Sequence, residues 1–384
     1  MLLKKIAVAI EKKQDSLFTY PKEKQEAYLK KLGKPADEIE RGYFQYRCQM
    51  KLYGWPLFAL LNCMALLLSV LYLVRFGRKN VAFEDKKQCL FFNNGIPENI
   101  VPPSLRKAHP DIQTIQGDNH CLDNADFQFL KEIFKRYPFS WMFWLKTIHK
   151  VSRYSAAIKQ FVPTAILCCD EFSYTCSVMT KYCRGKNIKL INVMHGEKLY
   201  FMRDSFVCYD EYYVWNQYYA DLLIELGAEP SQFKIEIPDS LKIPRNRAVQ
   251  KEYDYTYYLM AEDKQTLLKI VASLKKIQEK GKLVAVRPHP RYSDMETVKA
   301  VFEGFAIEDT KTVSIEKSIL RTKTAISLYS TVLNQAANNA VKIVIDDVSD
   351  AEKFSRLEER KYCMLKEEHQ LLSALVGDCN EKTY

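Results

Sequence analysis

Three short polar segments could do chemistry, because each directly follows an apolar run that predicts a β-strand. In open α/β sheets ligands bind at the carboxyl ends of the strands, so side chains in these positions face a bound molecule. The segments are His195-Gly196-Glu197 after LINVM, Arg287-Pro288-His289-Pro290-Arg291 after KLVAV, and Ser327-Leu328-Tyr329-Ser330-Thr331, which opens a helix that carries Asn334.

His195 is predicted to act as a general base on an acceptor hydroxyl, because imidazole is the side chain best suited to proton transfer near neutral pH. Gly196 lets the chain turn after the strand, and Glu197 is a second candidate catalytic residue beside it. Arg203 and Asp204 follow closely and are predicted to orient the acceptor. The alternative is a histidine whose only role is a hydrogen bond within its loop.

The segment from Arg287 to Arg291 is predicted to bind the phosphates of a donor. Its two prolines stiffen the loop and leave little entropy to lose on binding. Arg287 and Arg291 can each hold phosphate oxygens with a bidentate guanidinium. His289 is a candidate catalytic residue, because it can neutralise the phosphate that leaves when a glycosyl bond to a nucleotide breaks. The alternative is a proline-rich turn with solvated arginines.

The hydroxyls of Ser327, Ser330 and Thr331, together with Asn334, are predicted to complete the phosphate site. The N-terminus of a helix presents unpaired backbone amides and a positive dipole end, both of which favour an anion. Serine and threonine also cap many helices, so a capping role is the alternative.

Two adjacent carboxylates, Asp170 and Glu171, end the apolar run PTAILCC. They are predicted to bind the acceptor or to share the base role with His195. Capping of the next helix is an equally good interpretation.

The elements that must position these residues alternate between strands and helices from Val81 onward, which predicts parallel sheets with right-handed crossovers. The predicted fold is α/β, with two Rossmann-like doubly wound domains facing a cleft and preceded by a helical N-terminal region. We expect a helical region over 1–80, an acceptor domain over 81–236, a linker over 237–254 and a nucleotide-donor domain over 255–384. The long segment 126–160 is aromatic and helix-like.

An uncharged apolar run extends from Tyr53 to Val74. Its length meets the roughly 20 residues that span a bilayer. Basic residues flank it on both sides, so the positive-inside rule selects no orientation. Membrane attachment is predicted, either by a span or by a helix in the interface; a buried core helix is the alternative.

Composition narrows the classes of partner. The net charge of +10 fits an anionic partner, but lysines and arginines are scattered and no nucleic-acid motif is present, so nucleic acid is not predicted. The eleven cysteines contain no CxxC, which argues against zinc and for the reducing cytosol. No acidic metal motif ends a strand, Asp346-Asp347 reads as a surface turn, and neither metal nor cofactor is predicted.

The ordered set of MHG, RPHPR and SLYST over two α/β halves resembles bacterial surface-polysaccharide transferases of GT-B type. That group includes CDP-glycerol glycerophosphotransferases and the capsule transferases that use CMP-sialic acid or Kdo. The resemblance covers about Gln88 to Asp347. It implies a base at His195, donor phosphate binding at Arg287, His289 and Pro290, and a serine-rich turn at Ser327, Ser330 and Thr331.

The resemblance implies a glycosyltransferase that takes a nucleotide-activated sugar to a glycan or lipid-linked acceptor. Ala325 and Ile326 stand where glycerophosphotransferases carry an aspartate, which favours sugar transfer over polyol-phosphate transfer but selects no donor. By the resemblance, a CMP-sugar is the favoured donor. Alternatives are a polyol-phosphate transferase with a CDP donor, a nucleotide-sugar epimerase of the same fold, and a non-catalytic polysaccharide-assembly protein. The expected location is cytoplasmic, at the inner face of the cell membrane.

Overall fold

The computed structural model describes residues 19–77, 79–93, 95–244 and 250–377. The chain divides into two compact units. The first comprises Met1–His195 and Tyr200–Pro238, and the second comprises Gly196–Leu199 and Asp239–Tyr384. The predicted helical character of residues 1–18, and residues 245–249 of the predicted linker, lie outside the described residues.

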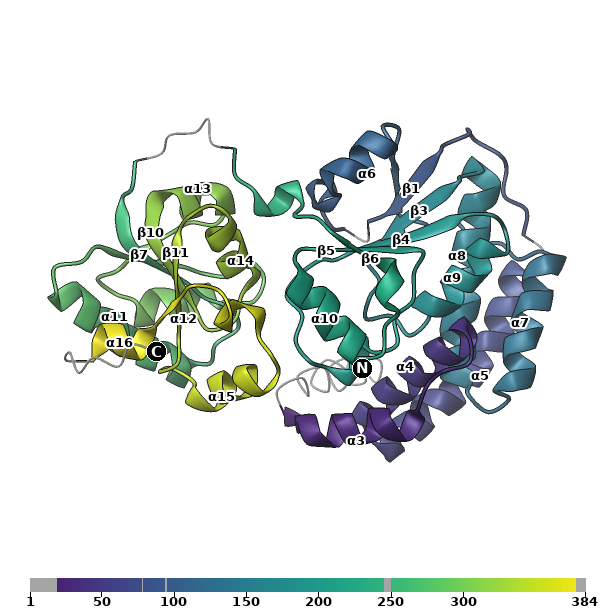
Figure 1. Cartoon of the computed structure of the whole chain (residues 1–384), viewed down its shortest axis with the longest axis horizontal. Helices are drawn as coiled ribbons and strands as arrows, with labels where there is room; N and C mark the ends of the chain where they lie inside the picture. The colour runs from purple at the N-terminus through teal and green to yellow at the C-terminus, as the bar shows by residue number, and fades with distance from the viewer. Residues whose placement is uncertain (1–18, 78, 94, 245–249, 378–384) are drawn as a thin grey trace. The chain divides into compact units, whose positions relative to one another are not determined.

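The first unit contains a parallel sheet of six strands in the order β2-β1-β3-β4-β5-β6 (Figure 1). Each strand pairs in parallel with its neighbours, so the carboxyl ends of all six lie along one edge of the sheet. The strands are β1 (Cys89–Phe92), β2 (Gln113–Ile115), β3 (Ala165–Cys168), β4 (Lys189–Val193), β5 (Glu211–Val214) and β6 (Phe233–Ile235).

Helices cover both faces of this sheet, because successive side chains of a strand point to opposite faces. One face packs Phe91, Leu167 and Ile191 against Ile100 and the helix α6 (Pro103–Ala108). The other face is covered by α8 (Trp141–Phe161), whose Tyr154 stacks on Phe92, and by α9 (Cys176–Arg184). The remaining helices of this half are α7 (Asn124–Arg136) and α10 (Gln217–Glu225).

Three helices precede the sheet and belong to the same compact unit. They are α3 (Lys22–Leu32), α4 (Glu38–Tyr53) and α5 (Trp55–Phe76). Asp37 caps α4 by accepting a hydrogen bond from the Glu40 amide. Gly54 joins α4 to α5 with a φ of 78°, a conformation that a side chain would strain.

The second unit repeats the plan with a parallel sheet in the order β12-β11-β10-β7-β8-β9. Its strands are β7 (Tyr253–Tyr258), β8 (Val284–Arg287), β9 (Ala306–Ile307), β10 (Thr322–Ser327), β11 (Lys342–Ile345) and β12 (Gln370–Leu371). One face is covered by α11 (Lys264–Glu279), α12 (Met295–Val301) and α16 (Leu372–Val376), which enclose an apolar core with Tyr257, Val286 and Ile326. The helices α13 (Ile315–Arg321), α14 (Thr331–Asn338) and α15 (Ala351–Glu359) complete the unit (Figure 1).

In both sheets the strand order reverses direction once. The chain moves outward from β1 to β2 and then returns to add β3 on the other side of β1. It likewise moves from β7 through β8 to β9 and then adds β10 on the other side of β7. These two doubly wound sheets, preceded by a helical N-terminal region, confirm the predicted α/β class with two Rossmann-like domains.

Residues 126–160 are helical, as predicted, apart from a short turn between α7, which ends at Arg136, and α8; Pro138, which has no amide hydrogen to donate, lies in that turn. One local prediction is wrong. Asp346 is fully buried, and its carboxylate accepts hydrogen bonds from the Tyr257 hydroxyl at 2.6 Å and from the Ser349 amide at 2.9 Å. It is an internal anchor of the second unit and not part of a surface turn.

We expect the first unit to lose stability as the pH falls from about 6.5 toward 4. Burial and the nearby charge of Arg153 lower the pKa of His120 to about 4. Burial and the nearby His120 lower the pKa of His149 to about 4 as well. Because the unfolded chain binds these protons more readily, the stabilisation present above the unfolded pKa is lost on acidification. The groups around the pair are Tyr72, Lys79, Asp118, Lys146, Lys150, Ser152 and Arg153.

Melting temperatures across this pH range check the expectation. The double variant His120→Gln/His149→Gln should show a shallower decrease than the unchanged protein, and His369→Gln in the second unit serves as control. Equal slopes in all three proteins would contradict it.

Candidate functional site

Glu171 and His195 meet at the carboxyl edge of the first sheet, after β3 and β4. Glu171 is fully buried, and its carboxylate lies 3.1 Å from Nδ1 of His195. The His195 amide donates to one carboxylate oxygen at 3.3 Å, and Nδ2 of Asn192 donates to the other at 3.3 Å. Oδ1 of Asn192 accepts from the Asp170 amide at 2.9 Å, which fixes the direction of the Asn192 amide group. His195 is therefore oriented by a buried carboxylate.

Asp170 points to a different partner, the ammonium group of Lys150 on α8. Burial alone would raise the pKa of Asp170, but the charge and hydrogen bond of Lys150, together with the charge of Lys146, outweigh it, and the pKa lies below its ordinary value. Lys146, one helical turn earlier, has its pKa lowered to about 8 by burial and by the charge of Lys150. Neither carboxylate caps α9, whose N-cap residue Thr175 makes no side-chain capping bond, so the capping alternative is wrong.

The ring of Phe172 lies beside both His195 and Arg203, the two partly exposed polar groups of this site. Its ring centre is 5.8 Å from that of His195, and the Arg203 guanidinium lies 5.5 Å from the Phe172 ring. Phe172 is 41 % exposed, and the side chains of His195 and Arg203 are 28 % and 29 % exposed. Asp204 is buried and pairs with Nε of Arg203 at 2.8 Å, so it orients Arg203. The exposed ring of Phe172 therefore adjoins both a histidine and an arginine.

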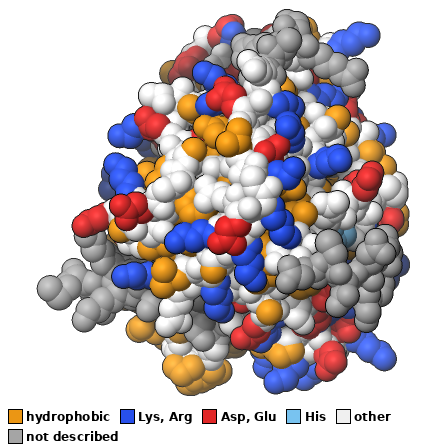
Figure 2. Space-filling view, turned by 90° about the vertical axis from the view of Figure 1, so that its left-hand side faces the viewer, with side chains coloured by type: hydrophobic (Ala, Val, Ile, Leu, Met, Phe, Trp, Pro, Cys, Tyr) orange, Lys and Arg blue, Asp and Glu red, His pale blue; other side chains and the backbone are white. Residues whose placement is uncertain are grey.

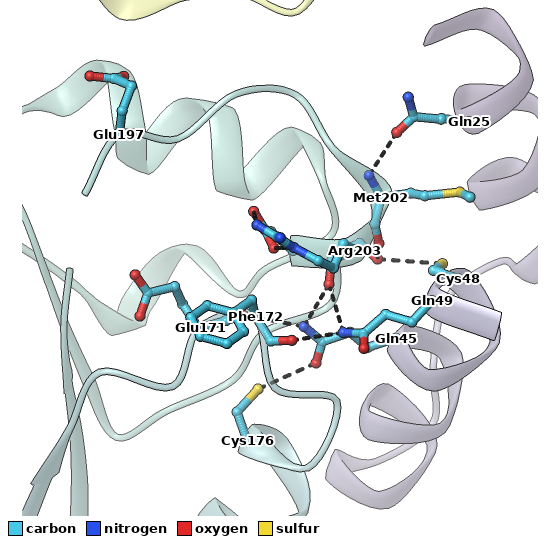
Figure 3. A network of polar contacts seen from close by, with 12 residues as sticks. Gln25, Gln45, Cys48, Gln49, Glu171, Phe172, Cys176, Glu197, Met202 and Arg203 are labelled. Carbon is cyan, nitrogen blue, oxygen red and sulfur yellow. Dashed lines mark hydrogen bonds and ion pairs between the residues drawn. The ribbon is translucent and has the colours of Figure 1, made fainter. Parts of the chain in front are cut away.

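Glutamines of the N-terminal helices hold the two loops that carry this surface (Figure 3). Nε2 of Gln45 donates to the Arg203 carbonyl at 2.9 Å and to the Glu171 carbonyl at 3.2 Å. Nε2 of Gln49 donates to the Phe172 carbonyl at 2.7 Å, and Oε1 of Gln25 accepts from the Met202 amide at 2.8 Å. All three glutamines are buried. The helices α3 and α4 are therefore part of the framework of the site.

In the second unit His289 is held in one tautomer. Its Nδ1 accepts hydrogen bonds from the amides of Arg291 at 3.1 Å and Tyr292 at 3.3 Å, and its ring stacks on Tyr292 with centres 4.5 Å apart. Burial and the charge of Arg291 lower the pKa of His289. The neutral ring therefore carries its proton on Nε2, where it can be donated to a bound anion. Arg291 is exposed.

Two other residues predicted to bind the donor turn inward. Arg287 is 7 % exposed, and its guanidinium contacts the Glu308 carboxylate at 3.1 Å and the Val313 carbonyl at 2.9 Å. Ser327 is 1 % exposed and donates its hydroxyl hydrogen to the Tyr258 carbonyl at 2.9 Å. Both side chains stabilise the loops at the ends of β7, β8 and β10.

The start of α14 shows the capping interaction expected of serine. The Ser330 hydroxyl accepts from the Val332 amide at 3.2 Å, and Thr331 is the first residue of the helix. Nδ2 of Asn334 donates to the carboxylate of Glu197. The segment Gly196–Leu199, which contains Glu197, is grouped with the second unit.

Two small pockets flank the carboxyl end of β7. One has a volume of about 180 Å³ and is lined by residues that directly follow β7 and β10, among them Met260, Leu328 and Tyr329. The other is about 210 Å³ and is lined by Ser293, Asp294 and Thr297. The carboxyl group of Glu262 borders both pockets, and burial raises its pKa. The first pocket lies at the point where the strand order reverses, the usual ligand position in doubly wound sheets.

Charge is distributed without a single basic block on the face shown in Figure 2, which views the chain from the side of α11 and α16. Lysine and arginine side chains there are interspersed with aspartate and glutamate. Within the described ranges no group of three or more His, Cys, Asp or Glu side chains could hold a metal ion.

Several residues of the site were not predicted from the sequence. Asn192 carried a usable signal, since it is the one polar residue in the strand run LINVM, and Phe172 directly follows the predicted pair of carboxylates. No such signal in the sequence marked Lys150, Glu262 or the supporting glutamines, because a polar residue in a helix or loop is ordinarily solvated.

Arg287→Ala is expected to destabilise the second unit by about 3–5 kcal/mol, because it leaves the buried Glu308 carboxylate without its main partner. Arg291→Ala, which changes an exposed arginine in the same loop, should alter stability by no more than about 0.5 kcal/mol. Denaturant unfolding of both variants measures the difference. Equal stability of the two variants would show that Arg287 is not a structural residue.

Comparison with known proteins gives a likeness of fold. No protein-family model and no curated protein sequence matches the chain. Solved structures that resemble it include the UDP-GlcNAc 2-epimerase of Neisseria meningitidis bound to UDP-GlcNAc, with 11 % identity, coverage of 71 % of this chain and 85 % of that one, and a TM-score of 0.42. The wall teichoic acid polymerase TagF resembles it with 12 % identity, 76 % and 80 % coverage, and a TM-score of 0.45. The lipopolysaccharide galactosyltransferase WaaB shows 14 % identity, 70 % and 80 % coverage, and a TM-score of 0.38. These values carry no residue correspondence, and the fold assignment rests on the two sheet topologies.

Proposed function

We propose that this chain is a glycosyltransferase that moves a sugar from a nucleotide-activated donor to an acceptor hydroxyl. The observation that carries the proposal is the His195–Glu171 pair at the carboxyl edge of the first sheet, beside the exposed ring of Phe172. A histidine backed by a buried carboxylate is suited to removing a proton from a hydroxyl group.

His195 serves as the general base. With Nδ1 directed at the Glu171 carboxylate, Nε2 is left with the lone pair that accepts the acceptor proton. Glu171 stabilises the imidazolium ion that forms. The acceptor oxygen attacks the anomeric carbon, the bond from that carbon to the donor phosphate breaks, and its electron pair leaves with the nucleotide. Arg203 and Phe172 bind the acceptor, one by charge and the other by apolar contact with a sugar ring.

The second unit binds the donor. The pocket beside Met260, Leu328 and Tyr329 accommodates the nucleoside, and Nε2 of His289 with the exposed guanidinium of Arg291 binds the phosphates. A neutral histidine donates one hydrogen bond to the phosphate without placing a second positive charge beside Arg291. Arg287 and Ser327 act indirectly, since they stabilise the loops that present these groups.

A CMP-sugar remains the favoured donor, supported by the resemblance of MHG, RPHPR and SLYST to the capsule transferases. A surface-glycan or lipid-linked acceptor is part of the same proposal. An epimerase of this fold would convert a nucleotide-sugar with no acceptor present, so product analysis without an acceptor separates the two activities.

The base assignment predicts that His195→Ala lowers kcat by about 10²-fold or more, because the acceptor hydroxyl loses its proton acceptor. Glu171→Gln keeps the shape of the partner but removes its charge, and should lower kcat with little change in the KM of the donor. Sugar transfer to a glycan acceptor is the measurement, with His109→Ala as the control histidine of the first unit. Full activity of His195→Ala with an unchanged melting temperature would refute the mechanism.

The donor assignment predicts stabilisation of the protein by its own nucleotide. A ligand at about 100 times its dissociation constant contributes about 2.7 kcal/mol, a visible shift in melting temperature. CMP, CDP, UDP and GDP are compared, and the variants His289→Ala and Arg291→Ala should lose the shift. Stabilisation by a uridine nucleotide would replace CMP by UDP as the donor, and no shift with any nucleotide would contradict the transferase proposal.

A further inference from the structure

The helix α5 has two faces of different character along its whole length. On one face Leu61, Ala65 and Ser69 are buried at a spacing of four residues, in contact with α8. On the opposite face Leu60, Leu67, Leu71 and Val74 are 50 %, 69 %, 65 % and 80 % exposed. Spacings of three, four and seven residues place these exposed side chains on one stripe. The exposed stripe is apolar, which is unusual for the surface of a soluble protein.

Polar bonds tie both halves of α5 to the first unit. In the first half, Nδ2 of Asn62 donates to the Phe139 carbonyl at 2.9 Å and Oδ1 accepts from the Met142 amide at 3.0 Å. In the second half, the Tyr72 hydroxyl lies 2.6 Å from Nδ1 of His120. A helix that crosses a bilayer would have to leave these partners or take the charged helix α8 with it. Only the exposed stripe is available to lipid.

The surroundings of the stripe are basic and aromatic. Between Glu40 and Glu84 the sequence contains no acidic residue. Lys51 precedes α5, Arg75 lies in its last turn and Lys79 follows it, and all three are exposed. Trp55 begins the helix with 77 % exposure, and tryptophan favours the interface between lipid and water. Cations at both ends of an apolar stripe are complementary to a surface of acidic headgroups over hydrocarbon.

We propose that α5 lies in the plane of an anionic membrane leaflet, with Leu60, Leu67, Leu71 and Val74 inserted below the headgroups and Lys51, Arg75 and Lys79 contacting the lipid phosphates. The helix meets the length and apolarity of a membrane span, at 22 residues and a mean hydropathy of 2.4, and only 22 % of its most apolar window is buried. Its contacts with α8 make it a lateral anchor instead of a span. This inference is independent of the reaction proposed above.

Flotation of the purified full chain with vesicles tests the anchor. Binding to vesicles of phosphatidylglycerol and phosphatidylcholine is expected to exceed binding to pure phosphatidylcholine. Leu67→Gln/Leu71→Gln should weaken binding by about tenfold or more, because two apolar side chains no longer enter the lipid. The matched control is Leu268→Gln/Leu283→Gln, which changes two leucines of the second unit that are 51 % and 63 % exposed.

Two outcomes of the flotation assay would overturn the proposal. One is equal vesicle binding by the two double variants. The other is no vesicle binding together with a concentration-dependent dimer that Leu67→Gln/Leu71→Gln abolishes, since the stripe would then be covered by a second copy of the chain. Neither outcome depends on sugar transfer, so failure of the anchor and failure of the transferase proposal are distinguishable.

Depth measurement separates the lateral anchor from a span. Cys63 is exposed on the stripe and the other cysteines in the described ranges are buried, so a fluorophore can be placed there in a Cys379→Ser background. The second position is Val74→Cys in a Cys63→Ser/Cys379→Ser background. Quenching by lipids labelled at different depths should place both positions at the same shallow depth. A position 63 deep in the bilayer with position 74 near the headgroups would show a span.

Discussion

The buried charge of Glu171 is the constraint on which the candidate site depends. A carboxylate removed from water is stable in a protein only when hydrogen-bond donors or a positive charge surround it. Here the donors are Nδ2 of Asn192 and the amide of His195, with the His195 ring at ion-pair distance. To supply them, the ends of β3 and β4 must lie in register, and Asn192 must occupy an otherwise apolar strand. The orientation of His195 follows from these requirements.

The same sheet geometry serves both units. Parallel pairing brings the strand-end loops of each sheet to one edge, and hydrogen bonds between neighbouring loops then hold them there. In the second unit the Ser293 hydroxyl accepts from the His289 amide at 2.8 Å and donates to the Met260 carbonyl at 3.2 Å. Ser327 makes the corresponding link between the ends of β10 and β7. Each loop is thus held by its neighbours, which limits the freedom that a bound ligand would have to remove.

The N-terminal helices link the candidate site to the proposed membrane anchor. Gln45 and Gln49 of α4 hold the loops of Phe172 and Arg203, and α5 begins two residues after α4 ends. The helices α3, α4 and α5 contact one another in sequence, and α5 also contacts α8, so the N-terminal helices pack as part of the first unit. If the proposed anchor docks on a membrane, the loops of Phe172 and Arg203 are supported by the helix that adjoins it, in keeping with the proposed acceptor on a lipid.

Local pattern in the sequence was sufficient for the central strands of both sheets. Alternating apolar runs and amphipathic stretches predicted β1, β3, β4, β5, β7, β8, β10, β11 and the doubly wound class, because burial on both sheet faces imposes a composition that is visible without tertiary contacts. The short edge strands β2, β6, β9 and β12 were not predicted. The strand-end positions of His195 and His289 were visible for the same reason. The helices α7 and α8 match the helix-like segment 126–160, and the break between them falls at Pro138, a signal that the sequence itself contains.

Only the tertiary structure distinguished the roles of like residues. Arg287 and Arg291 belong to one motif, yet the first is buried against Glu308 and the second is exposed. Asp170 and Glu171 are adjacent, yet one pairs with Lys150 and the other with His195. The physical reason is that a charged side chain takes the partner that folding brings to it from distant parts of the chain. Sequence determined which residues stand at the strand ends, and tertiary contacts decided which of them face inward.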